Sequence, residues 1–305
     1  MQNTMQVTLL SITNQAIGKK ALPKQFQETI RPDLVKKACE VIMANTRQPY
    51  GAFSEAGKRH SAKLSRRRRD YKTSYGIGIS RVPRKIISRR GTRFNWVGAF
   101  APGMVGGRRS HPPKADKQWE LKINKKERRK AIRSALAATM MSEVVKRRGH
   151  AVPAEYPFIV EAKLEELNKA AQVQEVLEKF GLKKELERAS RRKVRAGKGK
   201  WRGRKYDTAI GPLLVVSKEC PLLAAARNIP GIDAVPVHQL NAALLAPGAD
   251  VGRLTIFTEP ALVRLEQEGL FLQDGRSKKT NAEKPAVPVQ QKASKPAAKK
   301  AAQKK

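Results

Sequence analysis

The fold is decided by residues 213–267, which read LLVVSKECPLLAAARNIPGIDAVPVHQLNAALLAPGADVGRLTIFTEPALVRLEQ. Short continuous apolar runs in this stretch predict buried strands, and amphipathic runs between them predict helices. The strands are expected at 213–216, 232–237 and 254–257, and the helices at 222–227, 239–246 and 260–267. Pro236 weakens the middle strand, because proline donates no ladder hydrogen bond. Short apolar strands that alternate with helices favour a mainly parallel sheet covered on both faces, an α/β fold.

The same alternation extends toward the N-terminus. Another short apolar strand is expected at 158–160, followed by a helix at 173–180 that Gly181 ends. Two longer helices are expected upstream, at 31–45 and 124–149. Asn124 and Glu127 have the spacing of a capping box, so the second of these helices is expected to begin at Asn124.

Charge is concentrated in segments that lack a hydrophobic period. The chain carries 64 Lys and Arg against 26 Asp and Glu, a formal net charge of +38. Residues 47–110 hold a net +15, 181–206 a net +10 and 274–305 a net +8, whereas 149–180 and 207–273 are each at −3. An excess of this size repels itself unless a polyanion neutralises it, and nucleic acid is the commonest such partner.

The long basic insertion has no room for a core of its own. We expect residues 47–113 to be an extended loop, disordered in isolation and ordered by RNA, because structureless loops of this length are functional or disordered. Arginine binds phosphate in a bidentate manner, glycine admits close backbone approach, and aromatic rings stack on unpaired bases. The interleaved aromatic residues are Tyr50, Phe53, Tyr71, Tyr75, Phe94, Trp96 and Phe100. Fully extended and doubled back, such a loop would reach up to about 100 Å.

The remaining segments complete the domain organisation. Residues 1–46 and 114–273 are expected to form the α/β domain, with a second basic loop at 188–206 of the same composition as the insertion. Residues 274–305 are expected to be a disordered, Lys/Ala-rich basic tail.

Other functional classes find little support. The chain has no GxxxxGK[ST] or GxSxG motif, and its four histidines have no metal-ligand spacing with Cys39 and Cys220, so no enzymatic activity, cofactor or metal is expected. No helix-turn-helix or zinc-finger pattern supports a DNA-compacting protein, and no basic amphipathic helix supports a membrane-surface protein. Two distant cysteines and the absence of a signal peptide or long apolar span indicate the cytoplasm.

The sequence GGRRSHPP at 106–113 looks like the GGRRxHPP element of the ribosomal protein L4 family in its archaeal branch. Other stretches resemble the same family in the same order: RVPR at 81–84 with RGT at 90–92, RAGKGK at 195–200, and LNAALLAPG at 240–248. Together they cover nearly the whole chain to about residue 270.

This resemblance implies a three-layer α/β/α domain in the large ribosomal subunit, with its extended loop threading large-subunit rRNA to the wall of the polypeptide exit tunnel. It implies a structural role in translation, neighbouring ribosomal proteins as partners, a nascent peptide near the loop tip, and no homo-oligomer. The loop tip would carry Arg84, Lys85, Arg89, Arg90 and Arg93. The expected rRNA-binding residues are Arg47, Lys58, Arg59, Arg66, Arg67, Arg68, Arg69, Arg81, Arg84, Lys85, Arg89, Arg90, Arg93, Trp96, Arg108, Arg109, His111, Arg191, Arg192, Lys193, Arg195, Lys198, Lys200, Trp201, Arg202 and Arg204.

Overall fold

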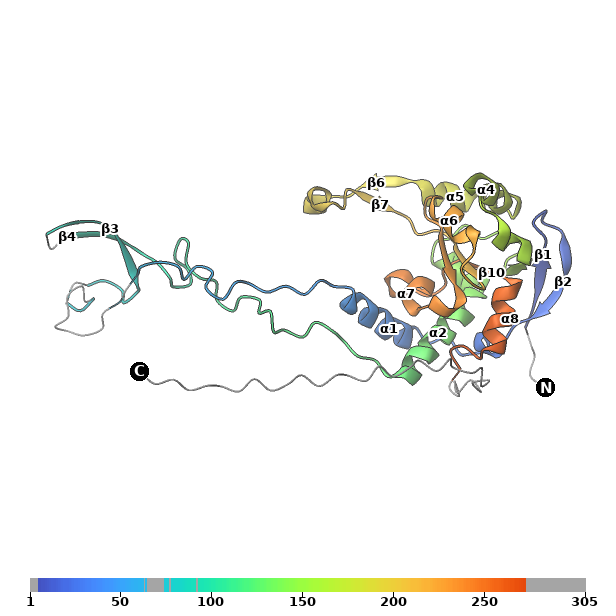
Figure 1. Cartoon of the computed structure of the whole chain (residues 1–305), viewed down its shortest axis with the longest axis horizontal. Helices are drawn as coiled ribbons and strands as arrows, with labels where there is room; N and C mark the ends of the chain where they lie inside the picture. Colours follow the sequence, from blue (N-terminus) through green and yellow to red (C-terminus); the bar gives the residue numbers. More distant parts are fainter. Residues whose placement is uncertain (1–4, 63, 65–73, 77, 92, 273–305) are drawn as a thin grey trace, which may run out of the picture.

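A six-stranded sheet organises the domain (Figure 1). The computed structural model describes residues 5–62, 64, 74–76, 78–91 and 93–272. Neighbouring strands follow the order β2 (Ala16–Ala21), β1 (Gln6–Leu10), β5 (Phe158–Val160), β10 (Thr255–Thr258), β8 (Leu213–Val216) and β9 (Asp233–Pro236). Every neighbouring pair is parallel except β1 and β2, which form an antiparallel hairpin at one edge. The mainly parallel sheet is therefore confirmed.

Helices cover both faces of this sheet. Along β8, Leu213 and Val215 belong to one apolar cluster, and Leu214 and Val216 belong to the other. The first cluster includes side chains of α1 (Pro32–Asn45), α2 (Lys125–Thr139), α7 (Ala242–Leu245) and α8 (Glu259–Gln267). The second includes side chains of α3 (Ser142–Arg147), α4 (Ala170–Lys179), α5 (Lys183–Ser190) and α6 (Pro221–Arg227). Alternate residues of one strand thus face opposite cores, as the three-layer α/β/α prediction requires.

Several expected elements differ from those observed. The helix expected at 124–149 is two helices, α2 and α3, which are separated at Met140 and Met141. The capping-box prediction is wrong, because Asn124 makes no side-chain cap hydrogen bond and Glu127 pairs instead with Lys37 at 3.0 Å. The helix expected at 239–246 is reduced to α7, since residues 237–239 form a separate 3₁₀ turn. Strands β1 and β2 were not expected, because their apolar residues are mixed with polar ones.

Pro236 is compatible with its strand because β9 lies at the edge of the sheet. The edge position leaves one side of β9 without a strand neighbour, so a missing N–H group costs no ladder bond there. No helix in the described ranges is long and apolar enough to cross a membrane. The tail expected at 274–305 lies outside the described residues.

Two projections extend from the domain (Figure 1). The first arm, residues 46–124, connects α1 to α2 and contains the hairpin strands β3 (Arg84–Arg90) and β4 (Arg93–Gly98). The second arm, residues 191–210, connects α5 to β8. It contains β6 (Arg192–Val194), a 3₁₀ turn at 197–202 and β7 (Tyr206–Thr208), which pairs antiparallel with β6. Both segments were expected to be loops, and both contain a β-hairpin.

Replacing residues 53–112 with a short Gly-Ser linker should leave the domain folded. The two ends already touch, since the backbone N–H of Ala52 donates to the carbonyl of Pro113 at 2.8 Å. Urea denaturation followed by circular dichroism should change the free energy of unfolding by no more than about 1 kcal/mol. As a control, Phe257→Ala removes a fully buried ring and should cost about 3–5 kcal/mol. Loss of the domain's cooperative transition in the linker variant would show that the first arm belongs to the core.

Candidate nucleic-acid interface

The first arm has two legs, an outgoing one that follows α1 and a returning one that leads to α2. They run antiparallel and are joined by hydrogen bonds at several points. Near the domain, the side-chain amide of Asn45 donates to the carbonyl of Leu121 at 3.2 Å, and the N–H of Leu121 donates back to Asn45 Oδ1 at 2.9 Å. The Ala52–Pro113 hydrogen bond follows, and farther out the Nε2–H of His60 donates to the carbonyl of Gly106 at 3.0 Å. These contacts hold the legs in one register without a continuous ladder.

Two glycines let the legs approach backbone to backbone. A Cβ at Gly51 would lie 2.5 Å from the backbone nitrogen of Ala115. A Cβ at Gly57 would lie 2.6 Å from the Cα of Arg108, and Gly57 also has a φ of +72°. Side chains at either position would push the legs apart. The glycines of this segment, expected to admit phosphate, therefore serve in part to bring the two legs together.

An aromatic and cationic stack lies near the root of the first arm. The rings of Tyr50 and Trp119 are stacked with centroids 5.2 Å apart. The guanidinium of Arg47 lies 4.0 Å from the Trp119 ring centroid, and the Lys117 ammonium lies 4.3 Å from it. Sequence reasoning selected Arg47 and Tyr50 but missed Trp119, which lies in the returning leg and meets them only through the leg register. Because Tyr50 and Trp119 lie in different legs and each ring covers one face of the other, the stack holds the two legs together without a bound partner.

The β3–β4 hairpin carries all five residues expected at the loop tip. Phe94 and Trp96 stack on one face of β4 with centroids 5.6 Å apart, and the Arg84 guanidinium lies 5.5 Å from the Trp96 ring centroid. Arg84 also donates to the carbonyl and hydroxyl oxygens of Ser80, at 2.7 and 3.0 Å. Alternation of aromatic and polar residues in β4 explains the strand, a pattern that the density of arginines obscured in the sequence.

The second arm carries exposed cations together with the exposed aromatic rings of Trp201 and Tyr206. Trp201 is 87% exposed, whereas Trp96 and Trp119 are stacked against other rings. Backbone hydrogen bonds close this arm, from the N–H of Arg195 to the carbonyl of Lys205 at 2.8 Å and from the N–H of Arg204 to that of Gly199 at 3.1 Å. Arg195 pairs with Asp207 at 3.0 Å. The remaining expected cations of this arm form no ion pair with another described residue: Arg191, Arg192, Lys193, Lys198, Lys200, Arg202 and Arg204.

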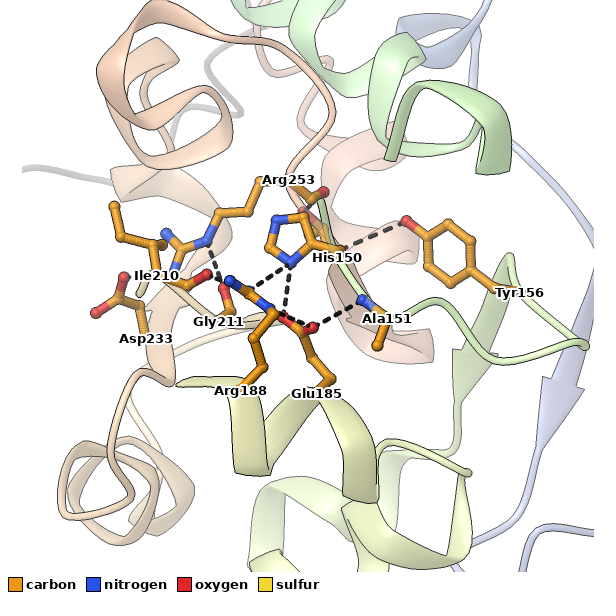
Figure 2. Close-up of polar contacts among 10 residues, drawn as sticks. His150, Ala151, Tyr156, Glu185, Arg188, Ile210, Gly211, Asp233 and Arg253 are labelled. Atoms are coloured by element: carbon orange, nitrogen blue, oxygen red, sulfur yellow. Dashed lines mark hydrogen bonds and ion pairs between the residues drawn. The ribbon is translucent and has the colours of Figure 1, made fainter. Parts of the chain in front are cut away.

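A buried ionic network fixes both ends of the second arm to the domain (Figure 2). Glu185 of α5 is fully buried and accepts hydrogen bonds from His150 Nδ1 at 2.7 Å, from the N–H of Ala151 at 2.9 Å, and from Arg188. Arg188 Nη2 also donates to the carbonyl of Ile210, at the end of the arm, at 2.7 Å. Burial by itself would raise the pKa of Glu185, but the hydrogen bonds from Arg188 and His150 outweigh it and lower the pKa to about 2.

A buried arginine, Arg253, secures the chain just beyond the arm (Figure 2). Arg253 is 1% exposed and donates to the carbonyl of Gly211 at 2.9 Å, to that of Leu244 at 3.0 Å, and to Asp233 at 2.5 Å. Burial lowers the pKa of Arg253. The carbonyl of Pro247 accepts from Arg148 at 2.5 Å. The stretch 240–248, which carried part of the family resemblance, thus supplies carbonyl acceptors for the buried Arg253 and the half-buried Arg148.

The expected site residues fall into separate groups. Lys58, Arg59, Arg81, Arg108, Arg109 and His111 lie along the first arm, with the guanidinium of Arg59 4.3 Å from the Phe53 ring centroid and that of Arg81 5.0 Å from the Tyr75 ring centroid. His111 has a φ of +44° and lies at a bend in the backbone. Arg66, Arg67, Arg68 and Arg69 lie outside the described residues. Both arms project toward the same side in Figure 1, so the fold brings the two basic segments onto one side of the domain.

The architecture is that of an α/β domain with two projecting basic arms. No group of three or more potential metal ligands occurs among the residues that the structure describes. Residues 20–268 match the family model described as the Ribosomal protein L4/L1 family. The chain belongs to this family, whose members are structural and non-enzymatic, so the protein is not an enzyme.

Several relatives are archaeal proteins named large ribosomal subunit protein uL4. The relative from Nanoarchaeum equitans is 50% identical over 268 residues, which cover 88% of this chain and 100% of that protein. Those from Methanococcoides burtonii and Archaeoglobus fulgidus are 43% and 40% identical, over 87% and 85% of this chain and 98% and 97% of theirs. The similarity therefore extends through both arms.

The depressed pKa of Glu185 predicts a pH-dependent stability. A carboxylate with a folded pKa of about 2 stabilises the fold fully above its unfolded value near 4.5, and this contribution disappears as the pH falls toward 2. Glu185→Gln should lower the free energy of unfolding by about 3 kcal/mol at pH 7, since Arg188 loses its buried counter-charge. Urea denaturation at pH 7 and pH 3.5 should show a smaller difference from the unsubstituted protein at the lower pH. The exposed Glu187→Gln on the same helix is the control, and an equal deficit at both pH values would contradict this account.

Proposed function

We propose that this protein is a structural constituent of the large ribosomal subunit that binds large-subunit rRNA through its two basic arms. The observation that carries this proposal is the unneutralised charge of the arms. Within the described residues, Arg195–Asp207 is the only ion pair that an arm cation forms with an arm carboxylate. Cations held apart from carboxylates remain available to phosphate, and their self-repulsion falls when a polyanion surrounds them.

The shape of the first arm suits a path through folded RNA. Its legs are held together by backbone contacts and stacked rings, and within the described part of the arm Ala99 and Ser74 alone are buried, so the arm is thin as well as long. A thin cationic arm can lie between RNA segments, where the surface of a globular domain cannot reach. Its β3–β4 hairpin, far from the domain in Figure 1, would carry Arg84, Lys85, Arg89, Arg90 and Arg93 to the wall of the polypeptide exit tunnel, near the nascent peptide.

The remaining parts of the proposal follow from the same arrangement. The domain would stay at the subunit surface beside neighbouring ribosomal proteins, and rRNA that folds around the arms would couple protein binding to subunit assembly. The proposed location is the ribosome in the cytoplasm, with no cofactor, no membrane contact and no homo-oligomer. A DNA-bound role is the alternative class, but the described part of the basic arms contains no α-helix that could enter a major groove.

Affinity for rRNA should fall steeply with salt. Variants of the second arm should distinguish phosphate binding by its cations from base stacking on Trp201. Replacing Arg191, Arg192 and Lys193 together with alanine should reduce the slope of log K against log salt by about 2–3, because about 0.7–0.9 is lost per phosphate contact. Trp201→Ala should instead weaken binding about 5- to 150-fold at every salt concentration, as expected for the loss of one stacked base. Filter binding to deproteinised large-subunit rRNA measures both quantities.

Exposed lysines of the α/β domain provide the matched control. Lys163, Lys179 and Lys184 lie outside both arms, and their combined replacement with alanine removes the same charge. This control should leave the slope nearly unchanged. Equal slopes for the two triple variants would show that the arms are not the phosphate-binding surface.

Sedimentation with large subunits through a high-salt gradient, followed by RNA crosslinking, tests the proposed function as a whole. Stoichiometric retention with crosslinks to large-subunit rRNA from both arms is expected. The 53–112 linker variant should retain its fold but enter subunits poorly. Recovery of DNA in place of rRNA would favour the alternative class, and recovery of neither would contradict the proposal.

A further inference from the structure

A partly apolar pocket of about 380 Å³ lies at the root of the first arm. Its apolar lining comes from both helices that the arm connects, with Ile42 from α1 and Ile132 from α2. Leu240, Ala242, Leu270 and Phe271 complete this apolar lining. The volume lies within the range of about 300–1,000 Å³ that is usual for small-molecule sites.

The polar lining of this root pocket is cationic or neutral. Arg128, Arg129, His238 and Asn241 contribute to it, and no carboxylate does. Arg128 is exposed, and its guanidinium forms no hydrogen bond or ion pair with another described residue. Asn241 Oδ1 is occupied, because it accepts from the N–H of Leu244 at 2.8 Å. That bond leaves the amide NH₂ of Asn241 as a donor beside the pocket.

Phe271 is held at the wall of the pocket in a costly conformation. Its φ is +64°, a backbone region that side chains other than glycine rarely adopt. Arg133, which is 5% exposed and paired with Glu28 at 2.7 Å, donates to the carbonyl of Phe271 at 2.6 Å. Arg129 donates to the carbonyl of Leu272 at 3.3 Å. Strained residues held by surrounding bonds occur preferentially at functional sites.

The pocket also continues the basic surface of the arm. Ile42 lies one turn before the first arm leaves α1, and Arg128 lies one turn after the arm enters α2. RNA that follows either leg toward the domain would therefore arrive at this pocket. Lys122, Lys125 and Lys126 are exposed and precede Arg128 in the chain, where the first arm leads into α2.

We propose that the root pocket binds one unpaired RNA nucleotide, with its base against the apolar floor and Phe271 and its phosphate at Arg128. This inference rests on the proposed function, since it requires RNA to lie along the arm. A base inside a double helix has both faces covered, so only an unstacked nucleotide can enter. The occupant is therefore a single-stranded loop, bulge or junction.

Charge argues against an occupant from this chain. Residues 274–305 hold a net +8 and would bring further cations to a pocket that already has two arginines. A segment of a neighbouring protein is the remaining alternative, and the test below distinguishes it from RNA.

Ultraviolet crosslinking of the full chain to deproteinised large-subunit rRNA, followed by mass spectrometry, tests the contact directly. A single-nucleotide adduct on the peptides that contain His238 or Phe271 is expected. In the same binding assay, Arg128→Ala should weaken binding about 5-fold or more and lower the salt slope by about 0.7. Ile42→Trp, which fills the pocket, should weaken binding about 5- to 150-fold with an unchanged slope.

Two matched variants control for non-specific effects. Met43→Trp introduces the same ring one residue along α1, at a side chain that is 61% exposed. Arg147→Ala removes an exposed arginine from α3. Both should bind as the unsubstituted protein does, and urea denaturation should show that all four variants are folded.

The outcomes separate this inference from the proposed function. If the unsubstituted protein binds rRNA through its arms while Arg128→Ala and Ile42→Trp match their controls, the root pocket is not a nucleotide site and the proposed function stands. An adduct on paired nucleotides, or a crosslink in intact subunits to another protein in place of rRNA, also overturns the inference. If the unsubstituted protein binds no rRNA, both proposals fail together.

Discussion

Burial of the central sheet on both faces restricts where the charged residues of this chain can lie. The four residues of β8 are at most 1% exposed and alternate between the two apolar clusters, so the strand offers no face to solvent. Charged side chains are consequently confined to outer helix faces and to connections between elements. Two connections, from α1 to α2 and from α5 to β8, are long and cationic. The separation of domain and arms follows from this restriction.

Arginine has two opposite structural roles in this protein. Arg188 and Arg253 donate to the adjacent carbonyls of Ile210 and Gly211, where the second arm returns to the domain, and each also pairs with a carboxylate, Glu185 or Asp233, and so they hold the arm's base in place. Arginines within the arm, such as Arg191 and Arg202, are exposed and have no such partners among the described residues. Arg188 and Arg253 find their hydrogen-bond acceptors and counter-charges within the fold, whereas the arginines of the arm need an external anion. A rigid base and an unneutralised outer part are what an arm requires to present charge in a defined direction.

The first arm is more ordered than its composition suggests. Paired contacts such as Asn45–Leu121 and His60–Gly106, together with the Tyr50–Trp119 stack, fix one leg against the other. Each contact removes conformational freedom that binding would otherwise have to remove, so a pre-aligned arm loses less entropy when it enters RNA. Mutual repulsion of the cations opposes this alignment until phosphate is present. Stacked rings and backbone contacts, which carry no net charge, are suited to maintain the register under that repulsion.

The sequence by itself determined the fold class, because continuous apolar strands that alternate with helices leave few alternatives to a covered parallel sheet. It also determined the two basic segments and the family, through motifs such as those at 106–113 and 240–248. Only the tertiary structure decided that 84–98 and 192–208 form hairpins, that Trp119 meets Arg47, and that Glu185 and Arg188 hold the base of an arm. These features depend on which distant residues become neighbours. Local composition cannot distinguish an arginine that finds a carboxylate in the core from one that remains exposed, since the partner is supplied by a different part of the chain.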